Sequence, residues 1–336
     1  MKITIKELAK MANVSVATVS RVMNHHPQGV SKEKREEILA LAEKYHYTPN
    51  LVAKSMVTQK SQCIGLLVPD IVNPFFQYLF RGLEDYVMPY GYSVFLCNTD
   101  NDPVKYLNCV KAMLGKSVDG FILTGYPLEI ADELNILLKH SKVISIDRYT
   151  EQCHFTQIIT DSFKSAYEMT NYLISKGHKK IACLTGPKEL YVTEERIRGY
   201  QAALEEHGIS YSDKLIVEGD FELQSGLKFG RQLVVESGAT AIFCFNDLMA
   251  QGVYQTCREM NKQIPEDISI VGFDDIYIAE LMAPSLTTIR QPKYEVGQLA
   301  GQLLMTWISE NTPPITPRPL DNQLIIRESV KTLIND

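Results

Sequence analysis

Apolar residues recur every three or four positions through the first 46 residues, which is the spacing of amphipathic helices. This pattern predicts three helices, over Ile5–Met11, Val16–Met23 and 31–45. Thr4 and Ser15 precede the first two helices and suit the N-cap position, where a hydroxyl oxygen accepts a bond from a free backbone N–H. The residues expected to face the core of this small bundle are Leu8, Met11, Val19, Val22, Ile38, Leu39, Leu41 and Ala42.

From residue 63 onward, the pattern changes to short apolar runs that alternate with amphipathic stretches. The runs lie at 64–68, 93–97, 120–123 and 143–146, and in a second set at 181–184, 215–217, 241–245 and 268–271. The stretches between the first four runs are 75–90, 104–116 and 128–139. Apolar strands that alternate with helices are typical of parallel sheets covered on both faces. We therefore expect an all-α head and an α/β body of two doubly wound parallel-sheet lobes.

The predicted helices of the head fit a helix-turn-helix, in which a third helix braces the first two. The second helix of such a motif enters the major groove, which carries the base code. Arg21 is then the candidate for a bidentate contact to guanine, and Val16 and Ala17 suit thymine methyl groups. Candidate phosphate contacts are Thr4, Ser15, Thr18, Ser20 and Asn24. The pattern alone leaves open a three-helix bundle that binds a protein.

The charge is divided unevenly between head and body. Through residue 60 there are ten Lys and Arg against five acidic residues, so the formal total of −6 leaves −11 for the rest of the chain. A basic head on an acidic body indicates that only the head meets a polyanion. A chance asymmetry is the alternative as far as charge alone is concerned.

The composition excludes several classes of protein. Hydrophobic residues make up 45% of the 336 positions, and no run approaches the ~20 apolar residues of a membrane span. The N-terminus lacks the pattern of a signal peptide, and seven scattered cysteines without a CxxC pair fit a reducing compartment. Metal-ligand spacings, a GxGxxG loop and a GxSxG elbow are also missing from the sequence. We therefore expect a cytoplasmic protein without a metal, a cofactor or a catalytic centre.

Three segments resemble the head and hinge of the lactose/galactose repressor (LacI/GalR) family. They are TIKELA at 4–9, VSVATVSRVMN at 14–24 and YTPNLVAKSM at 47–56. The resemblance continues over nearly the whole chain and implies a head at 1–48, a hinge at 49–61 and a periplasmic-binding-protein-like body at 62–336. The first lobe is then expected at about 62–160 and 292–323, and the second at about 161–291 and 324–330. The tetramer-forming tail of the lactose repressor is missing, which implies a homodimer.

The resemblance also implies a role for the hinge. It folds on the operator and wedges a side chain into the minor groove, which kinks the DNA. Where the family usually has Ala-Arg-x-Leu, this chain has Ala-Lys-Ser-Met at 53–56. Lys54 keeps the charge without the planar fork of arginine, and Met56 is a more flexible apolar wedge. The hinge candidates for DNA contact are Asn50, Ala53, Lys54 and Met56, and the alternative is a plain linker.

Polar and aromatic residues follow the predicted strands of the body, at the edge where doubly wound sheets bind ligands. They are Asn73, Phe75, Phe76, Asp147, Arg148, Phe221, Asn246 and Asp274. Carboxylates and amides pair with sugar hydroxyls, and aromatic faces stack on rings, although Asp and Asn at such places also cap helices. The family resemblance implies that these residues contact the effector, and it adds Arg196, three residues before Gly199.

The resemblance implies a transcription regulator, not an enzyme, whose affinity for a pseudo-palindromic operator changes when a small molecule binds. We expect a repressor released by an inducer, with a corepressor as the alternative. Arg148 and Arg196 favour a sugar acid or sugar phosphate unless carboxylates neutralise them. The candidate neutralising groups are Asp147, Glu194, Glu195 and Asp274.

We expect the effector to be a sugar or sugar derivative in preference to a purine. The purine-binding branch of the family has arginine where Leu190 stands and tryptophan where Arg148 stands. A periplasmic sugar-binding protein is the rival class, because its body would share this architecture. The basic head argues against that class.

Overall fold

The computed structural model describes residues 3–24, 28–48, 55, 58, 60–147 and 155–333. Contacts divide the chain into two compact units, Met1–Ser61 and Gln62–Asp336, each of which is described by itself. Within the described part of the chain, no helix has both the length and the apolar character that a bilayer crossing needs. Five predicted site residues lie outside the described residues, namely Asn50, Ala53, Lys54, Met56 and Arg148.

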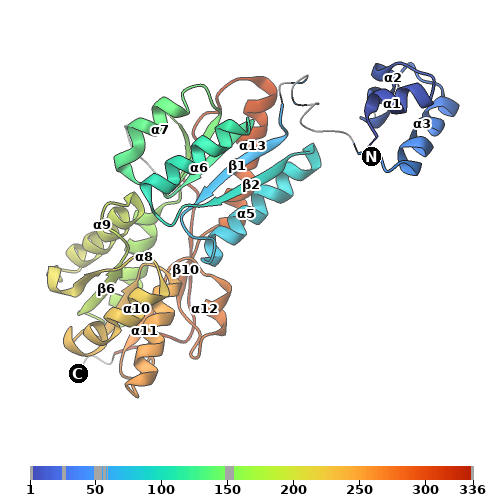
Figure 1. Ribbon diagram of the computed structural model, residues 1–336. Helices are drawn as coiled ribbons and strands as arrows, with labels where there is room; N and C mark the ends of the chain where they lie inside the picture. The colour runs from blue at the N-terminus through green and yellow to red at the C-terminus, as the bar shows by residue number, and fades with distance from the viewer. Residues whose placement is uncertain are drawn as a thin grey trace. The chain divides into compact units, whose positions relative to one another are not determined.

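The head contains three short helices around one small core (Figure 1). They are α1 (Ile5–Met11), α2 (Val16–Met23) and α3 (Lys32–Lys44). Two residues predicted for this core are wrong, because Met11 is 48% and Leu39 38% exposed. The buried stripe of α1 runs through Leu8, Ala9 and Ala12, a face rotated away from Met11. Met11 and Leu39 lie on faces of their helices that are turned away from this core.

Local hydrogen bonds fix where the helices of the head begin. The Thr4 hydroxyl accepts from the Glu7 N–H at 3.3 Å, and the Glu7 carboxylate accepts from the Thr4 N–H at 2.7 Å. This capping box satisfies two backbone donors reciprocally. Ser15 accepts from the Thr18 N–H at 3.1 Å, and Ser31 caps α3 in the same way.

The first lobe of the body is a five-stranded parallel sheet in the order β2-β1-β3-β4-β5. Its strands are β1 (Cys63–Val68), β2 (Ser93–Asn98), β3 (Gly120–Thr124), β4 (Val143–Ile146) and β5 (Thr156–Ile158). Its helices are α5 (Pro74–Val87) with η1 (Met88–Tyr90), α6 (Pro103–Gly115), η2 (Leu128–Ile130) with α7 (Ala131–Leu137), and α13 (Lys293–Glu310). α13 packs closely along α5, since a Cβ at Gly82 would lie 2.0 Å from the Tyr294 carbonyl oxygen.

The second lobe is a four-stranded parallel sheet in the order β7-β6-β8-β9. Its strands are β6 (Ile181–Thr185), β7 (Ile216–Glu218), β8 (Ala241–Cys244) and β9 (Ser269–Val271). Its helices are α8 (Ser162–Ser175), α9 (Tyr191–Glu206), η3 (Asp213–Leu215), α10 (Leu223–Arg231) with the π-helical η4 (Gln232–Glu236), α11 (Asp247–Glu259) and α12 (Tyr277–Leu281). The pairs α8–α9 and α10–α11 pack together around the sheet (Figure 1).

The two lobes are joined by segments that cross between them. Two short antiparallel strands, β10 (Thr288–Arg290) and β11 (Gln323–Ile325), flank α13 in the sequence. A third crossing follows β5, where Thr160 pairs with Leu320. The predicted fold class, an all-α head and two doubly wound parallel-sheet lobes, is confirmed. The crossings also bring the carboxyl ends of both sheets toward each other.

Candidate functional site

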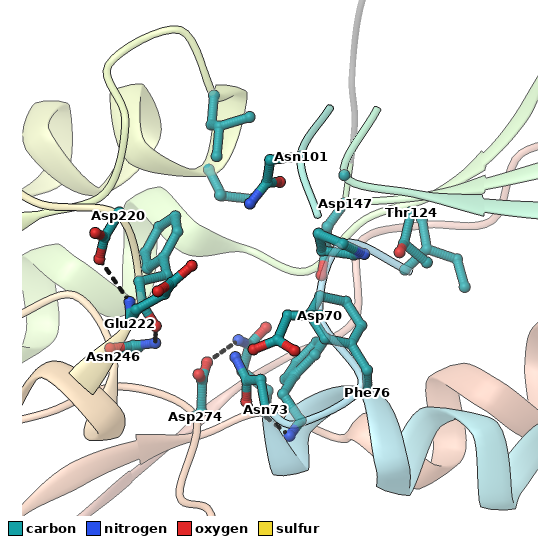
Figure 2. Close-up of a pocket in the computed structure, with 18 of the residues that line it drawn as sticks. Asp70, Asn73, Phe76, Asn101, Thr124, Asp147, Asp220, Glu222, Asn246 and Asp274 are labelled. Carbon is teal, nitrogen blue, oxygen red and sulfur yellow. Dashed lines mark hydrogen bonds between the residues drawn. The ribbon is translucent and has the colours of Figure 1, made fainter. Parts of the chain in front are cut away.

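A cleft lies where the carboxyl ends of the two sheets face each other, as doubly wound folds dictate (Figure 2). It encloses about 870 Å³ of empty space, a figure that includes the open mouth. From the first lobe it is lined by Pro69, Asp70, Asn73, Phe75, Phe76, Asn101, Thr124, Gly125, Ile146 and Asp147. From the second lobe and the crossing segment after β10 it is lined by Leu190, Val192, Arg196, Asp220, Phe221, Glu222, Asn246, Asp274 and Gln291.

The structure brings eight of the nine predicted effector residues together in this cleft. They are Asn73, Phe75, Phe76, Asp147, Arg196, Phe221, Asn246 and Asp274. Figure 2 shows Asp220 and Asn246 on one side of the cleft and Thr124 and Asp147 on the other. The ninth predicted residue is Arg148, which is outside the described residues.

Arg196 on α9 is the one cation among the described residues that line the cleft. It is 4% exposed, and its guanidinium lies against the Phe273 ring, 3.5 Å from the centroid. Nη1 donates to the Phe245 carbonyl, while Nε has no hydrogen-bond partner. A buried donor without a partner is costly. Arg196 is therefore held in place by the protein, and one of its donors is left unsatisfied.

Buried carboxylates surround this guanidinium without forming an ion pair with it. Burial lowers the pKa of Arg196, while Asp274, Asp147 and Asp247 act in the opposite direction. Burial raises the pKa of Asp274 to about 6, even though Arg196 opposes that shift. Burial also raises the pKa of Asp147. The carboxylates thus lie close enough to Arg196 to change its pKa. No ion pair among the described residues joins Arg196 to a carboxylate.

Two of the carboxylates considered as neutralising groups for Arg196 have other surroundings. Glu194 is exposed, and Glu195 forms an ion pair with Arg198 on the same helix. Arg198 itself lies on the surface, with 58% of its side chain exposed. Glu195 and Arg198 are three positions apart on α9 and so lie on one face of the helix, and neither residue lines the cleft.

Phe221 and Asn246 form one unit on the second lobe. Phe221 has a positive φ of 67°, and its ring lies against Gly186, where an added Cβ would come within 2.1 Å. Its ring centroid is 5.8 Å from the Arg196 guanidinium. The Asn246 Nδ2 donates to the Phe221 carbonyl at 2.7 Å, and its Oδ1 accepts from the Met249 N–H at 2.9 Å. Asn246 therefore caps α11 and also fixes the aromatic residue.

Asn73 has a similar double position on the first lobe. Its Oδ1 accepts from the Phe75 N–H at 3.0 Å and so caps α5, while the residue also lines the cleft. The rings of Phe75 and Phe76 meet edge to face, with centroids 5.1 Å apart. Phe75 belongs to the core of the lobe, and Phe76 packs against that core. Asn73 therefore caps α5 and lines the cleft at the same time.

Sequence reasoning missed several lining residues that come from the strand ends it passed over. Asn101 follows β2, and Thr124 and Gly125 end β3. Applying the strand-end rule to every strand would have found them. Gln291 had no such signal, because it follows the short antiparallel strand β10, which carries no apolar periodicity.

The mouth of the cleft is acidic on both sides. Burial raises the pKa of Glu222, and Asp220, Asp70 and Asp100 raise it further. Asp70 and Asp100 belong to the first lobe, so like charges face each other across the opening. Asp220 accepts hydrogen bonds from the Glu222 N–H and the Ser225 hydroxyl, which hold the Phe221 loop in its turn.

In the head, α2 presents its predicted recognition residues at the surface. Val16, Ala17 and Arg21 are exposed, while Val19 and Val22 are buried beneath them. The Arg21 Nη1 donates to the Gln28 carbonyl at 3.3 Å, which holds the side chain near the following loop. The remaining predicted contacts on this unit, Thr4, Ser15, Thr18, Ser20 and Asn24, are exposed or partly exposed.

Several of these polar groups already make local hydrogen bonds. Thr4 and Ser15 are caps, and the Asn24 Nδ2 donates to the Ser20 carbonyl at 2.8 Å. Among the residues that the structure describes, no cluster of three or more His, Cys, Asp or Glu could hold a metal ion.

Two sequence profiles match the chain. Residues 4–50 match bacterial regulatory proteins of the lacI family, and residues 170–330 match a periplasmic binding protein-like domain. The chain is 34% identical to the HTH-type transcriptional repressor PurR of Photobacterium profundum, over 98% of this chain and 99% of that protein. It is 36% identical to the ribose operon repressor of Halalkalibacterium halodurans, over 98% and 97%.

Solved structures of lacI-family regulators are also similar to this chain. The lac repressor dimer bound to operator and the anti-inducer ONPF is 25% identical, covers 98% of this chain and 100% of that chain, and has a TM-score of 0.88. A lacI-family regulator from Enterococcus faecium with bound ribose is 32% identical over 81% of this chain and 100% of that chain, with a TM-score of 0.73.

Proposed function

Because the chain belongs to the lacI family of bacterial regulatory proteins, we propose how its two units divide the work of a transcriptional repressor. The chain is a sequence-specific DNA-binding regulator with an effector-binding body, and it is not an enzyme. In our proposal it acts in the cytoplasm as a homodimer. Two recognition helices related by a two-fold axis then meet the two halves of a pseudo-palindromic operator.

The head reads the operator through the exposed face of α2. Arg21 contacts guanine, and Val16 and Ala17 lie against base edges in the major groove. The phosphate contacts are Thr4, Ser15, Thr18, Ser20 and Asn24, and the hinge contacts in the minor groove are Asn50, Ala53, Lys54 and Met56. The exposure of α2 above a closed apolar core supports this assignment.

The effector is a small sugar or sugar derivative, and the observation that carries this proposal is the unsatisfied Arg196. Its Nε has no partner, although Asp147 and Asp274 lie near enough to affect its pKa. A hydroxyl both accepts and donates, so a polyol can accept from the guanidinium and donate to the carboxylates at once. A purely anionic group would accept from Arg196 but would lie beside two carboxylates.

The aromatic residues support a ring-shaped ligand. The Phe221 ring lies 5.8 Å from the Arg196 guanidinium, and both line the cleft. A sugar ring places its polar edge and its apolar face on neighbouring sides, which fits such a pair. Ribose appears in the names of one relative and one solved neighbour of this chain, which adds support for a sugar.

Effector binding changes operator affinity because both ligands bias one dimer geometry. The effector contacts both lobes across the cleft, so it changes the angle between them. In our proposal this moves the first lobes of the two subunits apart, unfolds the hinges and releases the operator. The effector is therefore an inducer. The alternative is a corepressor, which would strengthen operator binding.

One experiment tests these proposals together. Bound DNA is selected from a random duplex library at fixed salt, with and without D-ribose, other neutral sugars, sugar acids, sugar phosphates and purine bases. We expect a palindrome whose binding weakens with one class of sugar. A response confined to purines would contradict the sugar assignment. A response confined to sugar acids would contradict the argument against an anion at Arg196. Tighter operator binding in the presence of the sugar would make the effector a corepressor and not an inducer.

A further inference from the structure

Four polar side chains form a continuous chain from one lobe to the other. Asp147 follows β4 in the first lobe, and its Oδ1 lies 3.1 Å from the Thr160 hydroxyl. That hydroxyl lies 3.0 Å from the Gln291 Oε1, and the Gln291 Nε2 lies 2.7 Å from the Asp274 Oδ1. Asp274 belongs to the second lobe. The chain therefore contains three hydrogen-bond links between two carboxyl groups.

The hydrogen atoms of these four groups do not suffice for three links. The Thr160 hydroxyl has one hydrogen, and it lies between two oxygens that only accept. The Gln291 amide has one face with two donors and one face with an acceptor, so it supplies a hydrogen on one side only. Two hydrogens are thus available for three links when both carboxyls are ionised. The third link needs a proton on one of the carboxyls.

Both orientations of the Gln291 amide lead to the same count. With Nε2 toward Asp274, Thr160 donates to Gln291, and Asp147 must carry the proton. With the amide turned over, Nε2 donates to Thr160, Thr160 donates to Asp147, and Asp274 must carry the proton. The 2.7 Å separation suits a hydroxyl donor as well as an amide donor.

Buried charges of both signs surround the chain. Arg196 on α9 and Lys293 on α13 are the nearby cations, and Lys293 donates to the carbonyls of Asp274 and Asp275. The anions that face them are Asp147, Asp274 and Asp247, which lies at the start of α11. Asp275 is separately paired with Arg290 and Arg327. With Asp275 and its two arginines included, four carboxyls face four cations, so the need for a proton rests on the count of hydrogens in the chain and not on net charge.

We propose that the Asp147–Thr160–Gln291–Asp274 chain is a proton site between the lobes, which holds one shared proton while its three links are intact. The proton moves between its two ends as the amide turns and belongs to the chain as a whole. Movement of the lobes that separates Asp147 from Asp274 breaks the chain and releases the proton. The angle between the lobes, and with it operator control, is therefore linked to pH.

The site also predicts the effect of substitutions. In Asp274→Asn, the new amide donates to Gln291, Gln291 donates to Thr160 and Thr160 donates to Asp147, so all links form without a proton. In Thr160→Val, Gln291 is released and keeps its Nε2 toward Asp274, which stabilises the ionised carboxylate. The proton affinity of the site then falls.

The test uses the full chain, labelled with ¹³C-aspartate, without effector or DNA, so that its result is independent of the proposed effector class. Infrared difference spectra between about pH 5 and about pH 8 follow the C=O stretch of protonated aspartic acid, since buried carboxyls titrate in this window. In the natural chain we expect a buried acid band from the Asp147–Asp274 chain with a midpoint near or above 6, and Asp247→Asn distinguishes it from the Asp247 carboxyl, whose pKa burial also raises. Asp274→Asn removes this band, and Thr160→Val lowers its midpoint by roughly one pH unit.

Thr170→Val is the matched control, because Thr170 is a buried threonine of the same body whose hydroxyl donates only to the Ala166 carbonyl. It should leave the midpoint unchanged. The proposal is overturned if the natural chain shows no titrating acid band, which needs no variant to fold. It is also overturned if Thr160→Val and Thr170→Val share the midpoint of the natural chain, since the proton would then belong to Asp274 alone.

Discussion

The head and the cleft of this regulator are built from opposite kinds of polar contact. In the head, Thr4, Ser15 and Ser31 bond within three residues of themselves, and the recognition face lies over a closed apolar core. In the cleft, Arg196 depends on residues 49 and more positions away and still has an unsatisfied Nε. Local contacts complete the head, whereas in our proposal the cleft is completed by its effector.

This difference predicts that the largest single effect is at Arg196. Arg196→Ala removes the guanidinium and leaves Asp147 and Asp274 facing the effector without a cation. Truncating one partner of a buried charged contact costs about 2–5 kcal/mol, so effector affinity should fall by roughly 30-fold or more. Operator binding in the absence of effector should be unchanged, and titration of the operator complex with the selected sugar measures both.

Arg198→Ala is the matched control for this prediction. It removes an arginine two positions away on the same helix, which is paired with Glu195 on the surface. Surface pairs of this kind contribute little. If Arg198→Ala loses the effector response and Arg196→Ala keeps it, the cleft assignment is wrong.

A second effect should appear in the pH dependence of stability. The Asp274 carboxyl has a pKa of about 6 in the folded chain, against an ordinary value of 3.8. The folded state therefore binds more protons than the unfolded state between these values, and the free energy of unfolding falls as pH rises through that window. The loss is up to about 3 kcal/mol at 1.36 kcal/mol per pKa unit. Urea unfolding of the full chain at about pH 4.5 and about pH 7 measures the part of this loss that falls between those values, about 2 kcal/mol.

Asp274→Asn should flatten that part of the pH profile, while Asp220→Asn should leave it in place. Asp220 also lines the cleft and accepts hydrogen bonds, but it is exposed at the mouth. Equal slopes in the natural chain and in Asp274→Asn would show that the buried carboxyl does not titrate in this window.

The third effect belongs to the head. If Arg21 contacts guanine as we propose, Arg21→Ala should cost about 1–3 kcal/mol at that base and relax the sequence preference there. Selection from a randomised operator position at fixed salt distinguishes the two readings of this arginine. A uniform loss over all sequences, with a smaller salt dependence, would mark Arg21 as a phosphate contact. Lys10→Ala, on the exposed side of α1, is the comparison variant for loss of charge alone.

The contrast between head and cleft also explains which parts of the structure could be predicted from the sequence. The head was predictable because its signals are local: Ser15 is both the cap and the start of α2. The strand-end rule found Asn73, Asp147, Asn246 and Asp274, since parallel sheets bring their carboxyl ends to one edge. The core face of α1 was misjudged at Met11, because spacing does not fix which side of a seven-residue helix is packed.

The links within the cleft could not be predicted in the same way. The Thr160–Gln291 contact joins positions 131 residues apart, through crossings that carry no apolar periodicity. The pairing of Asn246 with the Phe221 carbonyl spans 25 residues and depends on a positive φ at Phe221. Such contacts follow from the tertiary arrangement of the two lobes, so they appear only when the fold is known.

The smallest predicted effect tests whether the head is as local as it appears. Ser15→Ala removes the side-chain acceptor of the Thr18 N–H and should cost about 1 kcal/mol of helix stability. Amide exchange of α2 in the full chain should then be roughly fivefold faster, because 1 kcal/mol corresponds to about that factor. Ser15→Asn keeps a capping oxygen and should restore slow exchange. Faster exchange that spread into the body would show that the two units share stability, and the contrast between a locally completed head and a ligand-completed cleft would fail.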